Sequence, residues 1–112
     1  RWVIAELADG DAVSAVAADL AMLADYDRRH RTTGLTIFGT GSDEPVVRSF
    51  APADGIAEDP VCGSGNGAVA AYRLAAGQVD EGDAYVARQG MSVGRNGRVT
   101  IRYGADGIHV GG

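Results

Sequence analysis

A run of small residues in the middle of the chain constrains the fold more than any other feature. From Gly67 to Ala76, small side chains fall on nearly every face of the expected helix, which is typical of a helix packed closely on all sides. Strand-like segments precede and follow this run. The sequence therefore predicts a central, buried helix surrounded by strands.

The segments before this helix predict a strand, a helix and a loop. Trp2 to Leu7 is an apolar, strand-like run, and Asp11 is expected to cap an amphipathic helix that continues to Leu23. The charged segment from Asp25 to Arg31 is expected to be a solvated loop. The apolar spacing thus favours one helix of about three turns after the first strand.

Further strands are expected on both sides of the central helix. Residues 34–39 and 46–50 are rich in β-branched side chains and predict a hairpin joined by turn residues 41–45, whereas residues 51–60 read as irregular. Turn signals such as Asn96-Gly97 separate the later strands. These later strand candidates are Ala84 to Gln89, Arg98 to Tyr103 and Gly107 to Val110. One α+β domain over residues 1–112 follows from this order.

Composition narrows the classes of partner. The formal net charge is −5, and no run of Lys and Arg could follow a phosphate backbone. Cys62 is the single cysteine, and His30 and His109 are far apart in sequence, so neither an internal disulfide nor a metal site is expected. No apolar run approaches the roughly 20 residues of a membrane span. We therefore expect a cytoplasmic, metal-free protein that binds neither nucleic acid nor membrane.

The first residues suggest that the chain is one domain of a longer protein. The chain has no initiator Met and enters an apolar run at once, at Trp2. Natural N-termini normally begin with a few polar, poorly ordered residues. We expect a fragment on this ground.

The segment from Glu58 to Gly67 is the expected functional centre. Two carboxylates precede a turn whose glycines allow close approach of a ligand to the backbone. The turn runs into a helix N-terminus, where free N–H groups and the helix dipole attract anions. Ser64 could donate a further hydrogen bond. A substrate carboxylate or phosphate would fit this turn.

Residues 58–68 also admit other interpretations, from simple helix capping to nucleotide binding. Ser64 or Asn66 could be only an N-cap, and Asp59 only a solvated loop charge. Residues 63–68 formally satisfy the dinucleotide-binding pattern G-x-G-x-x-A, but charged residues and a proline stand where its hydrophobic strand should precede. A phosphate-binding Walker A loop is excluded because no Lys-Ser/Thr pair follows the glycines.

Three motifs in order resemble a known family. They are Arg48-Ser49-Phe50-Ala51-Pro52, then Glu58-Asp59-Pro60-Val61-Cys62-Gly63-Ser64, then Gln89-Gly90 followed by Gly94-Arg95. Together they resemble the C-terminal domain of a PhzF-like (phenazine biosynthesis) isomerase. The resemblance implies the diaminopimelate epimerase fold, in which a mixed β-sheet or half-barrel wraps around a central α-helix. Two such domains enclose the active site.

The resemblance also implies an activity and site residues. It implies cofactor-independent proton transfer at a carbon next to the carboxylate of a small substrate. The resemblance also implies a homodimer. Asp59 and Ser64 would be the catalytic residues. Substrate contacts would come from Cys62, Gly63, Ser64, Gly65 and Asn66. The family's principal acid/base, a glutamate, belongs to the N-terminal domain, so the chain would supply half of the site.

Two positions depart from this pattern or leave its chemistry open. The family often has histidine where this chain has Asn66, whose amide can hydrogen-bond but cannot shuttle protons. Cys62 stands where related amino-acid epimerases and racemases carry a catalytic thiol, although a small buried cysteine is usually inert. The expected function is thus an isomerase. The alternatives are a cysteine-dependent epimerase and a non-catalytic anion-binding module.

Overall fold

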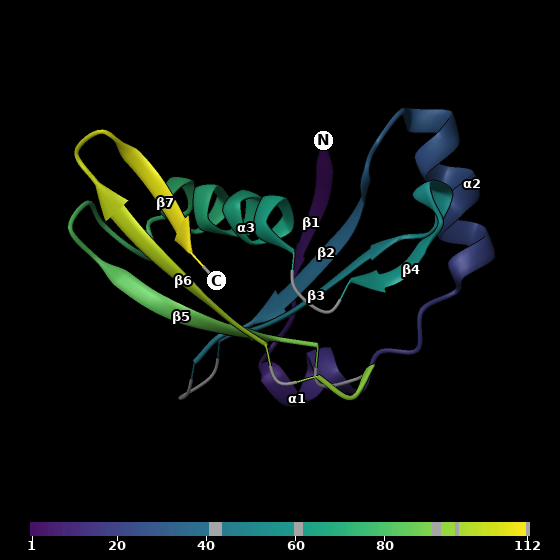
Figure 1. Ribbon diagram of the computed structural model, residues 1–112, viewed down its shortest axis with the longest axis horizontal. Helices are drawn as coiled ribbons and strands as arrows, with labels where there is room; N and C mark the ends of the chain where they lie inside the picture. The colour runs from purple at the N-terminus through teal and green to yellow at the C-terminus, as the bar shows by residue number, and fades with distance from the viewer. Residues whose placement is uncertain (41–43, 60–61, 91–92, 96, 112) are drawn as a thin grey trace.

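A computed structural model of the chain describes residues 1–40, 44–59, 62–90, 93–95 and 97–111 (Figure 1). Seven strands form one mixed sheet in the order β1-β2-β3-β5-β6-β7, and β4 pairs with β3 beside this path. The pairs β1–β2 and β3–β5 are parallel, and the others are antiparallel. The strands are β1 (Trp2–Glu6), β2 (Gly34–Gly39), β3 (Val46–Ala51), β4 (Ile56–Asp59), β5 (Ala84–Gln89), β6 (Gly97–Gly104) and β7 (Gly107–Gly111).

The sheet curls around one helix. The helices are α1 (Gly10–Ser14), α2 (Leu20–His30), the 3₁₀ turn η1 (Pro52–Asp54) and α3 (Gly63–Ala75). Figure 1 shows α3 lying across the hollow of the curled sheet, between β1 and β7, with α1 and α2 outside it. The predicted α+β half-barrel around an α-helix is confirmed.

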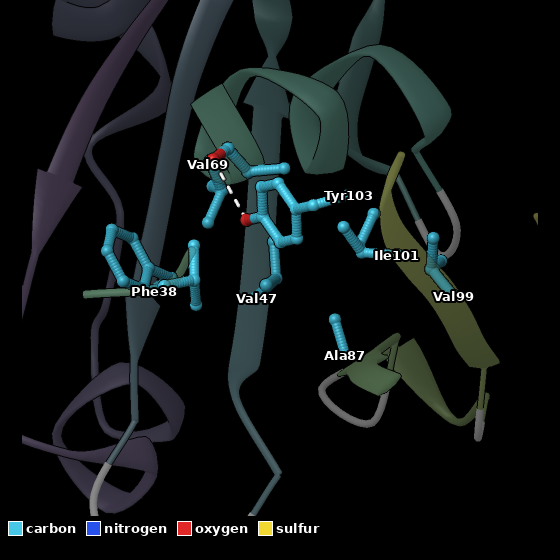
Figure 2. Close-up of a cluster of buried hydrophobic side chains, with 9 residues drawn as sticks. Phe38, Val47, Val69, Ala87, Val99, Ile101 and Tyr103 are labelled. Carbon is cyan, nitrogen blue, oxygen red and sulfur yellow. Dashed lines mark hydrogen bonds between the residues drawn. The ribbon is translucent and has the colours of Figure 1, made fainter. Parts of the chain in front are cut away.

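Two apolar clusters hold these layers together. The larger one lies between α3 and the sheet, and Figure 2 shows it with Tyr103 beneath Val69. The Tyr103 hydroxyl donates to the carbonyl of Ala70 at 2.9 Å, and burial, with the nearby Tyr85, raises the pKa of Tyr103, so this hydroxyl stays a neutral donor. The smaller cluster is Val13, Ile37 and Phe50, between α1 and the sheet.

The predicted helix from Asp11 to Leu23 is wrong. Two helices occupy this region, because Asp9 caps α1 and Asp19 caps α2, each accepting a hydrogen bond from the amide three residues on. The predicted loop at residues 25–31 is also wrong, since α2 continues to His30 and ends at Arg31 in the left-handed conformation. Basic residues in the last turn of α2 complement the helix dipole there.

Two other expectations need correction. The stretch 51–60 was expected to be irregular, yet it contains η1 and β4. The helix α3 begins at Gly63 rather than after Asn66, and it is not packed on all sides in this chain. Its Val69 face is buried, whereas Tyr72 and Leu74 are exposed.

The remaining strands and turns agree with expectation where they are described. The hairpin of β2 and β3 and the three later strands lie where the sequence predicts them. Turn residues 41–43 and Asn96 lie outside the described residues. The part of the chain that the structure describes has no helix of the length and apolarity that crossing a bilayer demands.

Candidate active site

The first turn of α3 carries backbone donors that face outward. Cys62 is the N-cap, and its sulfur accepts the amide of Gly65 at 3.2 Å, while its carbonyl accepts the amide of Asn66 at 3.0 Å. The amides of Gly63 and Ser64 are the first two of the helix, so they have no intrahelical acceptor. Both residues are exposed. The turn therefore presents two N–H groups and the positive end of the helix dipole.

The Ser64 hydroxyl has its orientation set by β1. The indole Nε1 of Trp2 donates to Ser64 Oγ at 2.9 Å, and the sulfur of Cys62 lies 3.6 Å from the same oxygen. Because an indole nitrogen can only donate, Ser64 must be the acceptor of this bond. The hydroxyl hydrogen of Ser64 is consequently left for Cys62 or for a ligand above the turn.

Gly65 brings α3 close to the sheet. A Cβ at this position would stand 2.6 Å from Ser49 Oγ and 2.9 Å from Thr36 Oγ1. These two buried hydroxyls are themselves hydrogen-bonded at 2.9 Å, across the β2–β3 pair. At Gly63 a Cβ would meet nothing within 4 Å. Gly65 thus allows close packing, whereas Gly63 leaves open space above the helix end.

The edge of β3 brings Asp59 to this turn. The first part of the edge pairs with the end of β5, placing Val47 opposite Gln89, and the next part pairs with β4, placing Ser49 opposite Asp59. Side chains alternate along a strand, so residues opposite Val47 and Ser49 share their face of the sheet. That is the face on which α3 lies. Asp59 is half-buried there.

A buried amide network joins Asp59 to the helix. The Nε2 group of Gln89 donates to the carbonyl of Asp59 at 2.9 Å, and its Oε1 accepts from the Cys62 amide at 3.2 Å. The same oxygen accepts from Asn66 Nδ2 at 2.7 Å, and that nitrogen also donates to the carbonyl of Cys62 at 2.8 Å. Gln89 and Asn66 are both 0 % exposed.

Glu58 has a different role from its neighbour Asp59. Its carboxylate forms a two-pronged ion pair with Arg48, with distances of 2.8 and 3.1 Å. Arg48 is 8 % exposed and also donates to the carbonyls of Val13 and Val16, next to α1. Alternation along β4 places this pair on the sheet face opposite α3. Glu58 therefore holds β4 in place beside β3.

The structure gathers the predicted site residues but gives them different surroundings. Gly63 and Ser64 are exposed at the helix end, and Asp59 is half-buried beside them. Cys62 is 6 % exposed and is the N-cap, so the alternative in which Ser64 or Asn66 is only an N-cap is wrong. Gly65 and Asn66 lie in the interior, against the sheet and Gln89.

Three residues of the neighbourhood were not singled out from the sequence. Gln89 and Arg48 each begin a motif that carried the family resemblance, so the motifs could have pointed to them. No local sequence pattern pointed to a role for Trp2 at the site, because its hydrogen-bond partner Ser64 is 62 positions away. Among the described residues, no group of three or more His, Cys, Asp and Glu side chains has the geometry to hold a metal ion.

A mixed sheet that curls around one helix defines the fold class of this chain. The chain belongs to the PhzC-PhzF family of phenazine biosynthesis-like proteins, which matches residues 1–111. A Schizosaccharomyces pombe protein named as an uncharacterized isomerase is 34% identical over 121 residues, covering 100% of this chain and 66% of that protein. Another protein of that yeast, antisense-enhancing sequence 1, is 36% identical over 73 residues, covering 64% of this chain and 25% of its own length.

Solved structures share the fold. A PhzF-family phenazine biosynthesis protein from Enterococcus faecalis superposes with a TM-score of 0.72 at 24% identity, over 96% of this chain and 38% of that one. A PhzF-family protein from Bacillus anthracis gives 0.71 at 18% identity, over 96% of this chain and 40% of its own. The chain thus spans well under half of these structures and at most about two-thirds of the curated relatives.

Proposed function

We propose that this chain supplies one half of an isomerase active site that moves a proton at a carbon next to the carboxylate of a small metabolite, without a cofactor. The observation that carries the proposal is the exposed first turn of α3, with the amides of Gly63 and Ser64, beside the half-buried Asp59. Family membership and the isomerase name of one relative support the reaction class.

The chemistry follows from where negative charge develops. When a base takes the proton from the carbon next to a carboxylate, the electron pair spreads onto the carboxylate oxygens. The amides of Gly63 and Ser64, the Ser64 hydroxyl and the helix dipole would stabilise that charge. The proton is then returned to the same or a conjugated carbon. Asp59 is the acid or relay on this side of the substrate.

The second half of the site would come from a domain that faces α3. Tyr72 and Leu74 of α3 are 39% and 42% exposed, so the sheet of this chain covers them only in part. By resemblance, the facing domain is N-terminal in the same enzyme and carries a glutamate as the principal base. A cytoplasmic homodimer with a biosynthetic role belongs to the same proposal.

A second candidate function rests on Cys62. Its sulfur lies at the helix N-terminus, accepts the Gly65 amide and stands 3.6 Å from Ser64 Oγ. A cysteine-dependent epimerase would use it as the base. We rank this candidate second because Cys62 is 6 % exposed and its sulfur already serves as the cap.

The test is deuterium incorporation from solvent, followed by proton NMR. Full-length protein containing this chain is incubated in deuterium oxide with a panel of small unsaturated and amino carboxylic acids. We expect label next to the carboxylate of at least one compound, and none when the 112-residue chain is used alone. Labelling by the isolated chain would contradict the half-site. A full-length protein that labels nothing but binds the carboxylates would favour the anion-binding module.

A further inference from the structure

We infer that Gln89 is a positioning residue that fixes Asp59 relative to the first turn of α3. The amide clamp consists of the Gln89 side chain, the Asn66 side chain and the backbone of Asp59 and Cys62. Gln89 comes from β5, Asp59 from β4 and Cys62 from the start of α3. The Gln89 side chain thereby binds the backbone of both Asp59, at the end of β4, and Cys62, at the start of α3.

The hydrogen-bonding pattern leaves Gln89 one orientation. Its oxygen meets two N–H donors, from Cys62 and Asn66, and its nitrogen meets the carbonyl of Asp59. Exchanging oxygen and nitrogen would place donors against donors and the oxygen against a carbonyl. The amide therefore uses its acceptor for the helix and its donor for the strand. Asn66 reinforces the helix side by donating also to the carbonyl of Cys62.

Burial makes these bonds consequential. Both amide side chains are 0 % exposed, and removing a partner from a buried polar group leaves that group without compensation from water. The strand end and the helix end would then settle in new positions. Reactions that depend on aligned groups can lose about 10²-fold in rate for a displacement of about 1 Å. The clamp thus connects a residue away from the substrate to the placement of Asp59.

The inference rests on the proposed function only for its kinetic test, which uses the full-length protein. Rates are measured as deuterium incorporation into the panel compound that the wild type labels. We expect Gln89→Met, which removes the clamp but keeps a similar shape, to lower kcat by at least tenfold. Tyr103→Phe is the matched control, because it removes a buried hydrogen bond to α3 at Ala70, away from Asp59. It should keep kcat within about twofold.

Gln89→Glu separates positioning from simple destabilisation. A protonated carboxyl can donate to the carbonyl of Asp59 and accept from the start of α3, as the amide does, whereas a carboxylate offers no donor to that carbonyl. The kcat of Gln89→Glu relative to wild type should therefore rise as the pH is lowered. A Gln89→Met variant that folds and keeps kcat within threefold of wild type would overturn the inference, as would a Gln89→Glu variant whose relative kcat does not rise as the pH is lowered. So would failure of both Gln89 variants to fold while Tyr103→Phe folds, because the role would then be stability alone.

A measurement without substrate separates failure of the clamp from failure of the proposed reaction. Amide hydrogen exchange at Cys62 should accelerate at least tenfold in Gln89→Met and stay unchanged in Tyr103→Phe. If the Cys62 amide in Gln89→Met stays as protected from hydrogen exchange as in the wild type, the amide clamp is contradicted, whatever reaction the protein catalyses. If protection is lost but Asp59→Asn is fully active, the reaction proposed for Asp59 is wrong and the contact geometry of the clamp stands.

Discussion

The first turn and the middle of α3 are held against the sheet by different forces. The middle of the helix buries Val69 and Ala70 in an apolar cluster with Phe38 and Tyr103 (Figure 2). Its first turn packs instead through Gly65 and hydrogen-bonded polar groups, among them the amide clamp. Apolar burial is non-directional, whereas hydrogen bonds fix distances and angles. The apolar middle of α3 therefore supports the fold, and the polar first turn sets the geometry at which chemistry is proposed.

The apolar cluster beneath the middle of α3 should respond to substitution mainly through stability. Phe38 is 0% exposed in the larger cluster, and Phe38→Ala is expected to lower the free energy of unfolding by about 3–5 kcal/mol, through lost burial and a cavity. Urea denaturation measures this. The control is Met22→Ala, since Met22 is 63% exposed and its loss should cost no more than about 0.5 kcal/mol. A cost below about 1 kcal/mol for Phe38→Ala would mean that this cluster is not the main core.

In the polar first turn of α3, an added methyl group should lower stability at Gly65 but not at Gly63. Gly65→Ala places a Cβ against Ser49 and Thr36, so we expect a loss of about 1–3 kcal/mol from overpacking, despite the better helix propensity of alanine. Gly63→Ala meets open space and should change stability by less than about 0.5 kcal/mol. Thermal denaturation compares the two variants. Equal effects at both glycines would contradict the close approach at Gly65.

The orientation of Ser64 can be tested through Trp2. Trp2→Phe keeps a ring but removes the N–H that donates to Ser64 Oγ, and we expect kcat/KM of the full-length enzyme to fall about three- to tenfold, as a net hydrogen bond is worth about 0.5–1.5 kcal/mol. In a Ser64→Ala background the same change should have no further effect, since the bond is already absent. Additive losses would show that Trp2 acts by another route.

Of these substitutions, Cys62→Ser should have the smallest effect on the reaction rate. Serine can also cap the helix by accepting the Gly65 amide, so Cys62→Ser is expected to cost only a few-fold in rate if a glutamate of the facing domain is the base. If the thiol is the base, the loss should be about 10²- to 10⁴-fold, and inactivation by iodoacetamide should disappear in the variant. A large loss in a correctly folded variant would move the protein to the cysteine-dependent epimerases.

Local signals predicted the strands better than the helices. Runs of β-branched residues between turn signals located β2, β3 and the later strands, because each strand is specified by its own side chains. The break between α1 and α2 was missed because apolar spacing continues across it, and the cap residues Asp9 and Asp19 were not recognised as two separate helix starts. Burial of α3 depends on what surrounds it, which its own small residues do not specify.

The site was predictable as a segment but not as an arrangement. Residues 58–67 could be recognised because turn, helix start and carboxylates lie within a short stretch. The opposite faces of Glu58 and Asp59 follow from pairing with β3, which no local pattern reveals. The contacts of Trp2 with Ser64 and of Gln89 with Asp59 join residues 62 and 30 positions apart. Such contacts arise only when the sheet closes around α3.

The most direct test of the account is the turnover of Asp59→Asn in the full-length enzyme. The change keeps the size of the side chain and removes its capacity to give and take a proton. We expect turnover to fall by about 10²-fold or more, while the thermal midpoint stays close to that of the wild type, as for a positioned acid in proton transfer. Near wild-type turnover in a folded Asp59→Asn enzyme would remove Asp59 from the reaction and contradict the proposed half-site.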